Sequence, residues 1–253
     1  MAPLGRRNRR VVEAARLHQT RERRDQGRTL LEGPNLLGAA LASGVIPEVV
    51  FAVEADRRTA EIARDRGLDL VLVDDAALMR LAGTKSPRGP VAVLAVPAGT
   101  PDHGAGMLVS WGVSDPGNVG TLIRIAAAFG WDFGHTNGTS DPWSPKVLRA
   151  GAGGHFLVGI RHIQSVEGLE GAGYSPVATI VAGGRAPWDL EPGRYAVLVG
   201  EESSGLPIEV IERSRFKVTI PMTGGQESLN AAMAAGIIVY ELSKPGREGQ
   251  GRV

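Results

Sequence analysis

The chain has 253 residues and a net charge of +1 at neutral pH; 43% of its residues are hydrophobic and 22% are charged. This composition is typical of a globular protein with one large or two smaller domains. The absence of cysteine excludes disulfide bonds, thiolate catalysis and zinc sites with cysteine ligands. No apolar run reaches the length of about 18 residues that a membrane span needs, and no apolar segment follows the arginine-rich N-terminus as in a secretory signal. We therefore expect a cytoplasmic protein.

Basic residues are concentrated at the N-terminus. Residues 1–28 contain nine arginines and three acidic residues, so this segment carries a net charge of +6 and the rest of the chain carries −5. A basic arm on an acidic body predicts contact with a polyanion such as RNA. The alternative is a solvated helix in a chain that uses arginine far more than lysine throughout.

Residues 1–97 are predicted to form a small α/β domain. A helix is expected over 10–24, and Asn35 is placed to cap a second helix through 36–41. Apolar runs predict strands at 29–32, 49–53, 70–73 and 91–96. The segment 98–106 is rich in Pro and Gly and is expected to be a linker.

Residues 107–244 alternate apolar strands with helices, which predicts a mainly parallel sheet covered by helices on both faces. The expected strands are 107–113, 177–181, 195–199 and 216–220. The expected helices are 121–129, 145–150, 208–213 and 228–242. The tail 245–253 is rich in Gly, Arg and Glu and is predicted to be disordered.

Ligands bind beyond the carboxyl ends of strands in such sheets, and three loops at these positions are unusual. The first is Asp115-Pro116-Gly117-Asn118-Val119-Gly120, which leads into a helix with Arg124. Pro and Gly favour a tight turn, and Asn118 is placed to cap the helix or to hold backbone groups. The Arg124 guanidinium suits a phosphate near this turn. An ordinary turn followed by a solvent-facing arginine is the alternative.

The second loop is Gly200-Glu201-Glu202-Ser203-Ser204-Gly205-Leu206-Pro207, which follows an apolar strand. Two glycines that flank two acidic residues fit a loop wrapped closely around a flat ligand. Glu202 is placed to anchor a hydroxyl group or another side chain. The alternative is a helix N-terminus with glutamates at the positive end of the dipole and proline in the first turn.

The third loop is Ile220-Pro221-Met222-Thr223-Gly224-Gly225-Gln226-Glu227-Ser228-Leu229-Asn230, which runs into the apolar stretch 231–240. A helix that is apolar nearly all round is expected to be buried. Ser228 and Asn230 lie at its start, where they can satisfy free backbone groups and face a ligand. The small residues of this helix permit close packing, including packing against a second subunit.

Other patterns point to no chemistry. Gly83-Thr84-Lys85-Ser86 lacks the GxxxxGK[ST] phosphate loop, and no GxGxxG follows a strand. The five histidines show no metal-ligand pairing, so we expect no metal. A hydrolase with Ser228 as nucleophile would need a GxSxG elbow, which is absent.

Taken in order, the three loops resemble the three motifs of the SpoU (TrmH) family of SPOUT methyltransferases. The segment Ser144-Pro145-Lys146-Val147-Leu148-Arg149-Ala150 resembles a family segment between the first two motifs. Residues 8–96 resemble the family's N-terminal substrate-binding domain, which is related to an RNA-binding ribosomal protein. Its recognisable pieces are Leu31-Glu32-Gly33-Pro34 and Pro87-Arg88-Gly89-Pro90-Val91-Ala92.

The resemblance implies an α/β SPOUT domain with a trefoil knot, which sequence reasoning alone would not propose. It also implies a homodimer and S-adenosylmethionine bound among the knot loops. Gly200, Ile220 and Leu229 match the positions that usually contact this cofactor, and Met222 lies nearby.

The reaction implied is methyl transfer to a ribose 2′-hydroxyl of RNA. By resemblance, the catalytic site contains Asn118, Arg124, Glu202, Ser228 and Asn230. Because an arginine side chain stays protonated in proteins, we favour Arg124 as a holder of phosphate and ribose, with proton loss late or assisted by Glu202 or water. Direct contacts to RNA are expected from Arg9, Arg10, Arg24 and Arg149.

Three departures from the family pattern concern substrate placement. Gly151 stands where serine is common, residues 135–137 where an apolar strand is usual, and Trp111 at a commonly acidic position.

The separate N-terminal domain favours ribosomal over transfer RNA as substrate. The rival hypotheses are a non-catalytic RNA-binding or ribosome assembly protein and a base methyltransferase of the same superfamily. Housekeeping modification and antibiotic resistance both remain open.

Overall fold

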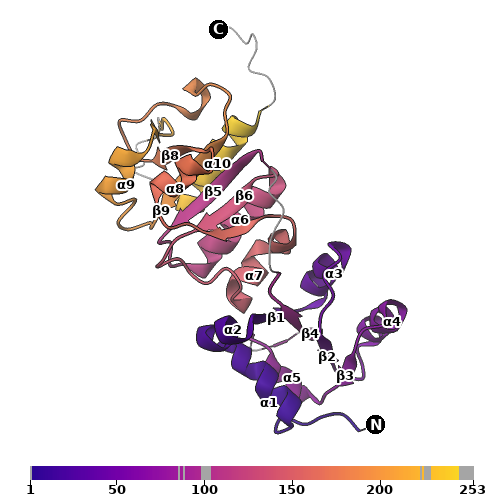
Figure 1. Ribbon diagram of the computed structural model, residues 1–253. Helices are drawn as coiled ribbons and strands as arrows, with labels where there is room; N and C mark the ends of the chain where they lie inside the picture. The colour runs from indigo at the N-terminus through magenta and orange to yellow at the C-terminus, as the bar shows by residue number, and fades with distance from the viewer. Residues whose placement is uncertain are drawn as a thin grey trace. The chain divides into compact units, whose positions relative to one another are not determined.

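The computed structural model describes residues 2–84, 86–87, 89–97, 104–222, 224 and 229–244. The chain divides into two compact units, each with its own sheet (Figure 1). Unit 1 comprises Met1–Gly99 and Asp141–Phe156, and unit 2 comprises Thr100–Ser140 and Leu157–Val253. Within the described ranges, no helix is long and apolar enough to cross a membrane.

Unit 1 contains a four-stranded sheet in the order β1-β4-β2-β3. The strands are β1 (Arg28–Glu32), β2 (Val49–Ala52), β3 (Leu70–Leu72) and β4 (Val91–Ala95). β4 is antiparallel to β1 and β2, whereas β3 is parallel to β2. The helical segments are α1 (Arg9–Ala15), η1 (Arg16–His18), α2 (Thr20–Gln26), α3 (Pro34–Ala42), α4 (Arg57–Arg66), α5 (Asp75–Leu81), α7 (Pro145–Gly151) and η2 (Gly154–Phe156).

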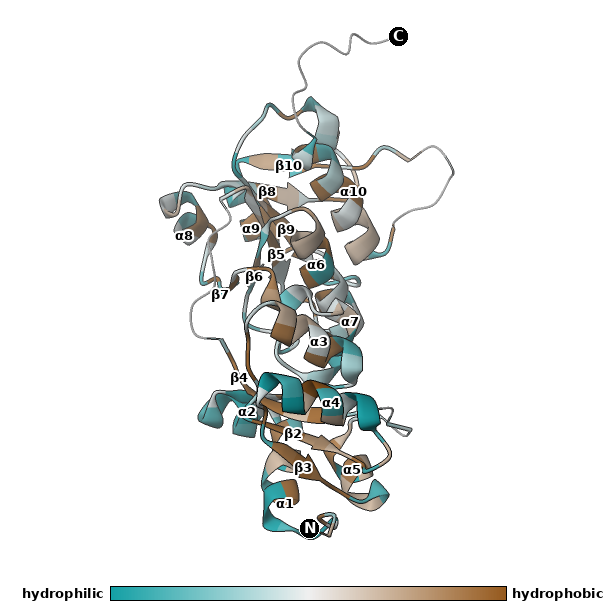
Figure 2. Cartoon of the chain, turned by 90° about the vertical axis from the view of Figure 1, so that its right-hand side faces the viewer, coloured by the Kyte–Doolittle hydropathy of each residue, from teal (hydrophilic) through white to brown (hydrophobic). Residues whose placement is uncertain are grey.

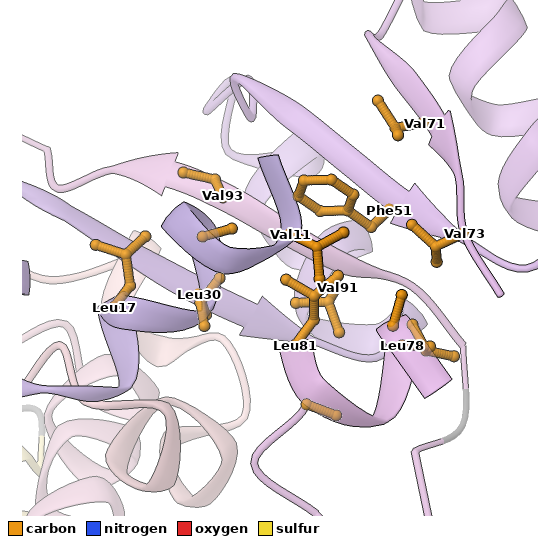
Figure 3. Packing of buried hydrophobic residues seen from close by; sticks show 13 residues of the cluster. Val11, Leu17, Leu30, Phe51, Val71, Val73, Leu78, Leu81, Val91 and Val93 are labelled. Atoms are coloured by element: carbon orange, nitrogen blue, oxygen red, sulfur yellow. The ribbon is translucent and has the colours of Figure 1, made fainter. Parts of the chain in front are cut away.

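Apolar side chains cover both faces of this sheet, because successive residues of a strand point to opposite sides. Leu30 packs with Phe51 and with Val11 of α1 in one cluster, which Figure 3 shows. The next residue, Leu31, belongs to a second cluster that includes Leu148 of α7. Figure 2, coloured by hydropathy, shows that the strands of this sheet are apolar whereas the helix α4 is largely polar. The predicted α/β character of the N-terminal part is thereby explained.

Two local predictions in unit 1 are wrong. The helix expected over 10–24 is broken into α1, η1 and α2, with extended backbone at Gln19. The buried Arg23 donates to the carbonyl oxygens of Leu17 and His18, which the break leaves free. The cap of α3 is Gly33 rather than Asn35, since its φ of 96° favours glycine and Pro34 occupies the first turn.

Ion pairs also connect the segment Asp141–Phe156 to the rest of unit 1, in addition to the apolar packing of Leu148. Arg23 makes an ion pair of 2.6 Å with Asp141, and Arg149 makes one of 2.8 Å with Glu32. The family-like segment before the second motif is therefore anchored to residues more than 100 positions earlier.

Unit 2 contains a six-stranded sheet in the order β10-β8-β9-β5-β6-β7. The strands are β5 (Gly106–Trp111), β6 (Asp132–His135), β7 (Ile160–His162), β8 (Ser175–Thr179), β9 (Tyr195–Gly200) and β10 (Phe216–Val218). Every pairing is parallel, which confirms the predicted sheet. The helical segments are α6 (Pro116–Ala128), α8 (Val166–Gly171), η3 (Pro187–Asp189), α9 (Ile208–Arg213) and α10 (Ala231–Ser243).

The connections of this sheet run in opposite directions from the place where β5 and β9 lie side by side. From β5 the chain continues through α6 to β6 on one side, whereas from β9 it continues through α9 to β10 on the other. Ligands of open α/β sheets bind at such a point, beyond the carboxyl ends of the strands. The first and second unusual loops leave these two adjacent strands.

Candidate active site

The loop after β5 is held by a cap at the start of α6. Asp115 accepts a hydrogen bond of 2.8 Å from the backbone N–H of Asn118. The predicted capping role of Asn118 is therefore wrong, and α6 begins at Pro116 rather than at 121. Because the carboxylate of Asp115 fills this role, the Asn118 side chain is available to other elements.

The loop after β9 folds back on itself tightly. A Cβ atom added to Gly200 would lie 2.2 Å from the backbone carbon of Gly205, and Gly205 N–H donates to the Glu201 carbonyl at 2.8 Å. The Glu201 carboxylate accepts a bond of 2.6 Å from the backbone N–H of Ser114. Glu201 thus connects the second loop to the first, a role that sequence reasoning missed. The two adjacent acidic residues Glu201 and Glu202 were the sequence feature that could have indicated it.

Asn230 joins all three loops. Its Nδ2 donates to Asn118 Oδ1 at 3.1 Å and to Glu202 Oε1 at 2.6 Å. Its Oδ1 accepts from the backbone N–H groups of Ala232 and Met233, and so caps α10. Since the backbone groups only donate, the amide oxygen must face the helix and the amino group must face the two partners. The capping role expected of Asn230 is confirmed.

Of the two remaining expected site residues, the structure describes Arg124 but not Ser228. Arg124 lies on the exposed side of α6 and has no hydrogen-bond or ion-pair partner among the described residues. Its guanidinium is therefore available to a ligand. Ser228 lies outside the described residues, so its expected position at the helix start stays a prediction.

A pocket lies beside this constellation. All four residues expected to contact the cofactor line it: Gly200, Ile220, Met222 and Leu229. The other lining residues come from the ends of β8, β9 and β10 and from α10, and they are Thr179, Ile180, Val181, Val199, Glu201, Glu202, Gly205, Val218, Ala231, Ala234 and Ile238.

The lining fits S-adenosylmethionine, which carries a flat adenine and a positively charged sulfonium. Ile180, Val199 and Ile238 provide apolar walls, as ligand pockets commonly do for aromatic groups. Glu201 and Glu202 provide negative charge, which favours a nearby cation.

The helix α10, which was expected to be buried, is buried on one face only. Ala232, Ala235, Ile238 and Val239 are buried, but Met233, Ile237 and Tyr240 are exposed by 61%, 38% and 52%. The exposed residues recur at helical spacing and so lie on one face. In the single chain the expected burial therefore holds for one face of α10 and not for the other.

The arginines expected to contact RNA lie in unit 1. Arg9 pairs with Glu13, and Arg10 pairs with Asp69. Arg24 is exposed in the last turn of α2, and Arg149 holds Glu32 while remaining partly exposed. No group of three His, Asp or Glu side chains among the residues described here is arranged to hold a metal ion.

Comparison with known proteins accounts for nearly the whole chain. Residues 106–240 match the SpoU rRNA methylase family, and residues 8–92 match the MRM3-like substrate-binding domain. The chain is 31% identical over 243 residues to the 23S rRNA (guanosine(2553)-2′-O)-methyltransferase RlmP of Bacillus subtilis, covering 93% of this chain and 96% of that protein. It is 34% identical over 249 residues to an uncharacterized tRNA/rRNA methyltransferase of Synechocystis, covering 91% and 89%.

Solved structures agree. The SpoU methyltransferase AviRb of Streptomyces viridochromogenes, in complex with AdoMet, superposes with a TM-score of 0.84 at 26% identity, over 94% of this chain and 97% of that one. The prediction of a SPOUT fold and of an S-adenosylmethionine-dependent RNA methyltransferase is confirmed. The chain belongs to the SpoU rRNA methylase family.

Proposed function

We propose that this chain transfers the methyl group of S-adenosylmethionine to a ribose 2′-hydroxyl of ribosomal RNA. The observation that carries the proposal is the bonding of Asn230 to both Asn118 and Glu202 beside the pocket. The cofactor supplies a methyl group activated by the sulfonium charge. Bound in this pocket, the cofactor would supply the methyl group to the ribose oxygen and keep the bonding electron pair on its sulfur, and the hydroxyl proton would pass to Glu202 or to water.

The protein must therefore align the hydroxyl group and receive its proton. One carboxylate oxygen of Glu202 is bonded to Asn230, which leaves the other to accept from the ribose hydroxyl, directly or through water. Asn118 is oriented by the same amide group. Arg124 is assigned to the phosphate beside the target ribose, because a guanidinium presents several donors to phosphate oxygens. Ser228 is assigned to orienting the ribose.

Ribosomal RNA is proposed as the substrate because of the two family matches and the 23S rRNA activity named for the Bacillus subtilis relative. Arg9, Arg10, Arg24 and Arg149 are proposed to contact it. The domain boundaries proposed are 1–97 for substrate binding, 98–106 for a linker, 107–244 for the methyltransferase and 245–253 for a tail.

A homodimer is proposed through α10. Its exposed Met233, Ile237 and Tyr240 form an apolar face, and Tyr240 also contacts Phe129 of α6 at a ring distance of 6.1 Å. Burial of this face against a second copy would remove apolar side chains from water. The trefoil knot and the cytoplasmic location stay predictions.

The test is methyl transfer by the full chain. The purified protein is incubated with methyl-labelled S-adenosylmethionine and transcripts of large- and small-subunit rRNA, with tRNA as the comparison. The RNA is digested to nucleosides, and we expect label in a 2′-O-methylated nucleoside from rRNA. Label on a base would favour the base methyltransferase, and RNA binding without any transfer would favour the non-catalytic alternative.

A further inference from the structure

Three polar side chains cluster at the carboxyl ends of β6 and β7, outside the pocket. The ring centroids of His135 and His162 are 5.3 Å apart in an edge-to-face arrangement. His162 Nε2 lies 3.1 Å from Asn137 Oδ1. His162 and Asn137 are exposed, whereas His135 is half-buried. His135 and Asn137 belong to the segment where the sequence departs from an apolar pattern.

The cluster lies close to the first catalytic loop. His135 pairs in register with His162 on one side and with Ser110 of β5 on the other. Since neighbouring strands are about 5 Å apart, the cluster begins one strand spacing from β5. Asn118 follows Ser110 by only eight residues.

Hydrogen bonds fix the loop after β6 to the loop after β5. Thr136 N–H donates to the Ser110 carbonyl at 3.1 Å, and Gly112 N–H donates to Thr136 Oγ1 at 3.0 Å. Thr139 Oγ1 also donates to the Ser110 carbonyl, at 3.0 Å. A ligand held by the cluster would therefore be held in register with the catalytic loop.

The chemistry of the cluster suits an unpaired nucleobase. Asn137 Oδ1 accepts from His162 Nε2, so the Asn137 amino group keeps both N–H donors for a base carbonyl or ring nitrogen. An exposed imidazole offers a flat face, and unstacked RNA bases stack on such rings. An exposed hydrogen bond of this kind adds little to stability.

A phosphate fits the cluster less well. Arg161 carries a permanent positive charge and directly precedes His162 on β7, so its side chain points to the opposite face of the strand. It pairs with the buried carboxylate of Asp132 at 3.4 Å. The exposed groups of the cluster are thus a ring and an amide rather than a set of cations.

We infer that His162 and Asn137 form a second RNA subsite, which takes an unpaired nucleobase next to the methylated nucleotide and sets the register of the substrate. His135 is a positioning residue that supports the His162 ring. The inference rests on the proposed function, because it presumes an RNA substrate at the neighbouring loop.

The test compares His162→Ala, Asn137→Ala and His162→Phe with the unaltered full chain. The probe is the shortest rRNA transcript that the unaltered chain methylates, and its Kd is measured in the presence of S-adenosylhomocysteine. We expect about tenfold weaker RNA binding and a higher KM for RNA in His162→Ala, because one stacked base is lost. His162→Phe should bind within about threefold of the unaltered chain, because the ring is kept. Glu170→Gln on α8 is the remote control.

A double-mutant cycle that combines protein variants with abasic RNA identifies the nucleobase that His162 contacts. Transcripts with an abasic site one to three nucleotides from the target are bound to each variant. At one position of the abasic site, its effect on the binding free energy and the effect of His162→Ala should not be additive, because each change removes the same contact. Additivity at every position would overturn the inference, as would an unchanged Kd in His162→Ala. A smaller salt dependence in that variant would also overturn it, since it would indicate a phosphate contact.

Two readouts separate this inference from the proposed function. The melting temperature and the affinity for S-adenosylmethionine should be the same in all variants. If the unaltered chain methylates no RNA, the proposed function fails and the subsite fails with it. If the chain methylates RNA but the variants bind it equally well, the subsite alone fails.

Discussion

Asn230 Nδ2 lies 2.6 Å from Glu202 Oε1, and this bond joins the start of α10 to the loop after β9. The Oδ1 atom of the same amide group caps α10, so one side chain both fixes the helix and orients the carboxylate. The position of the Glu202 carboxylate therefore depends on the first turn of α10.

Replacement of Asn230 by aspartate separates the two roles. In Asn230→Asp the new carboxylate would still cap the helix, but the side chain would lose both donors and place a second negative charge beside Glu202. We expect the rate of methyl transfer under single-turnover conditions to fall by about 100-fold, with the melting temperature nearly unchanged. Asn230→Ala should lose activity and about 1 kcal/mol of stability as well. An active Asn230→Asp enzyme would remove the amide from the mechanism.

Arg124→Ala should abolish methyl transfer. The side chain is exposed and without a partner among the described residues, so its loss should leave the fold and the oligomeric state intact. Arg124→Lys keeps the charge but not the fork of donors and should recover part of the RNA affinity. Turnover assays and size-exclusion chromatography with light scattering check both. Full turnover in Arg124→Ala would contradict its assignment to the substrate phosphate.

Gly200→Ala should open the loop after β9. The added Cβ would meet the backbone of Gly205 at 2.2 Å, which cannot be relieved by a side-chain rotation. We expect at least tenfold weaker binding of S-adenosylmethionine by calorimetry and a lower melting temperature. Gly171→Ala is the matched control, because nothing lies within 4 Å of its added Cβ. Equal affinities in the two variants would mean that the loop is not part of the cofactor site.

His155 should make stability depend on pH. Burial lowers its pKa from the usual 6.5 to about 4, and the hydrogen bond to the Pro142 carbonyl only partly offsets this. Between these values the unfolded chain binds the proton and the folded chain does not. The free energy of unfolding should therefore fall as the pH falls, by about 1.4 kcal/mol per pH unit from 6.5 to 4.

Urea unfolding of the full chain at pH 7 and pH 5 measures this effect. The His155→Leu variant should be less stable at pH 7, because the bond to Pro142 is lost, but its stability should change less between the two pH values. All other groups are the same in the two proteins, so the difference between their changes in unfolding free energy isolates the histidine. Parallel pH profiles would contradict the assignment.

The Arg23–Asp141 pair should contribute strongly to the integrity of unit 1. The two side chains are exposed by only 4% and 14% and lie 2.6 Å apart. Arg23→Met leaves a largely buried carboxylate without its counter-ion and should cost about 3 to 5 kcal/mol in urea unfolding. Arg23→Met with Asp141→Asn should cost less, because no charge is stranded. Arg9→Ala is the control at an exposed ion pair and should leave the melting temperature unchanged.

Sequence patterns located most of the sheet of unit 2. The central strands β5 and β9 are buried on both faces, so they read as continuous apolar runs. The short strands β6 and β7 carry Asp132, Arg161 and two histidines, and no apolar run predicts them. The charged side chains of these strands have partners far along the chain: Asp132 accepts a hydrogen bond from Gly159 N–H and forms an ion pair with Arg161.

Helices α4 and α5 could have been predicted. Asp56 and Asp74 cap them, and Gly67 ends α4 in the left-handed conformation. These start and stop signals are visible in the sequence. The charged surface of α4 hides its weak apolar stripe, whereas α8 is too short for periodicity to detect.

The sequence by itself determined the order of the three loops, the parallel sheet between them and four residues that line the pocket. The loops and the sheet follow from local patterns, since an apolar run, a glycine and a polar cap act within a few residues. The four lining residues follow from the resemblance of these loops to the motifs of the SpoU family. Only the tertiary structure decided that Asn230 bonds to Asn118, 112 positions earlier. It also decided that one face of α10 is exposed and that Asp141–Phe156 packs with unit 1. Hydrogen bonds and burial between distant residues depend on where whole loops are placed, and no local pattern encodes that placement.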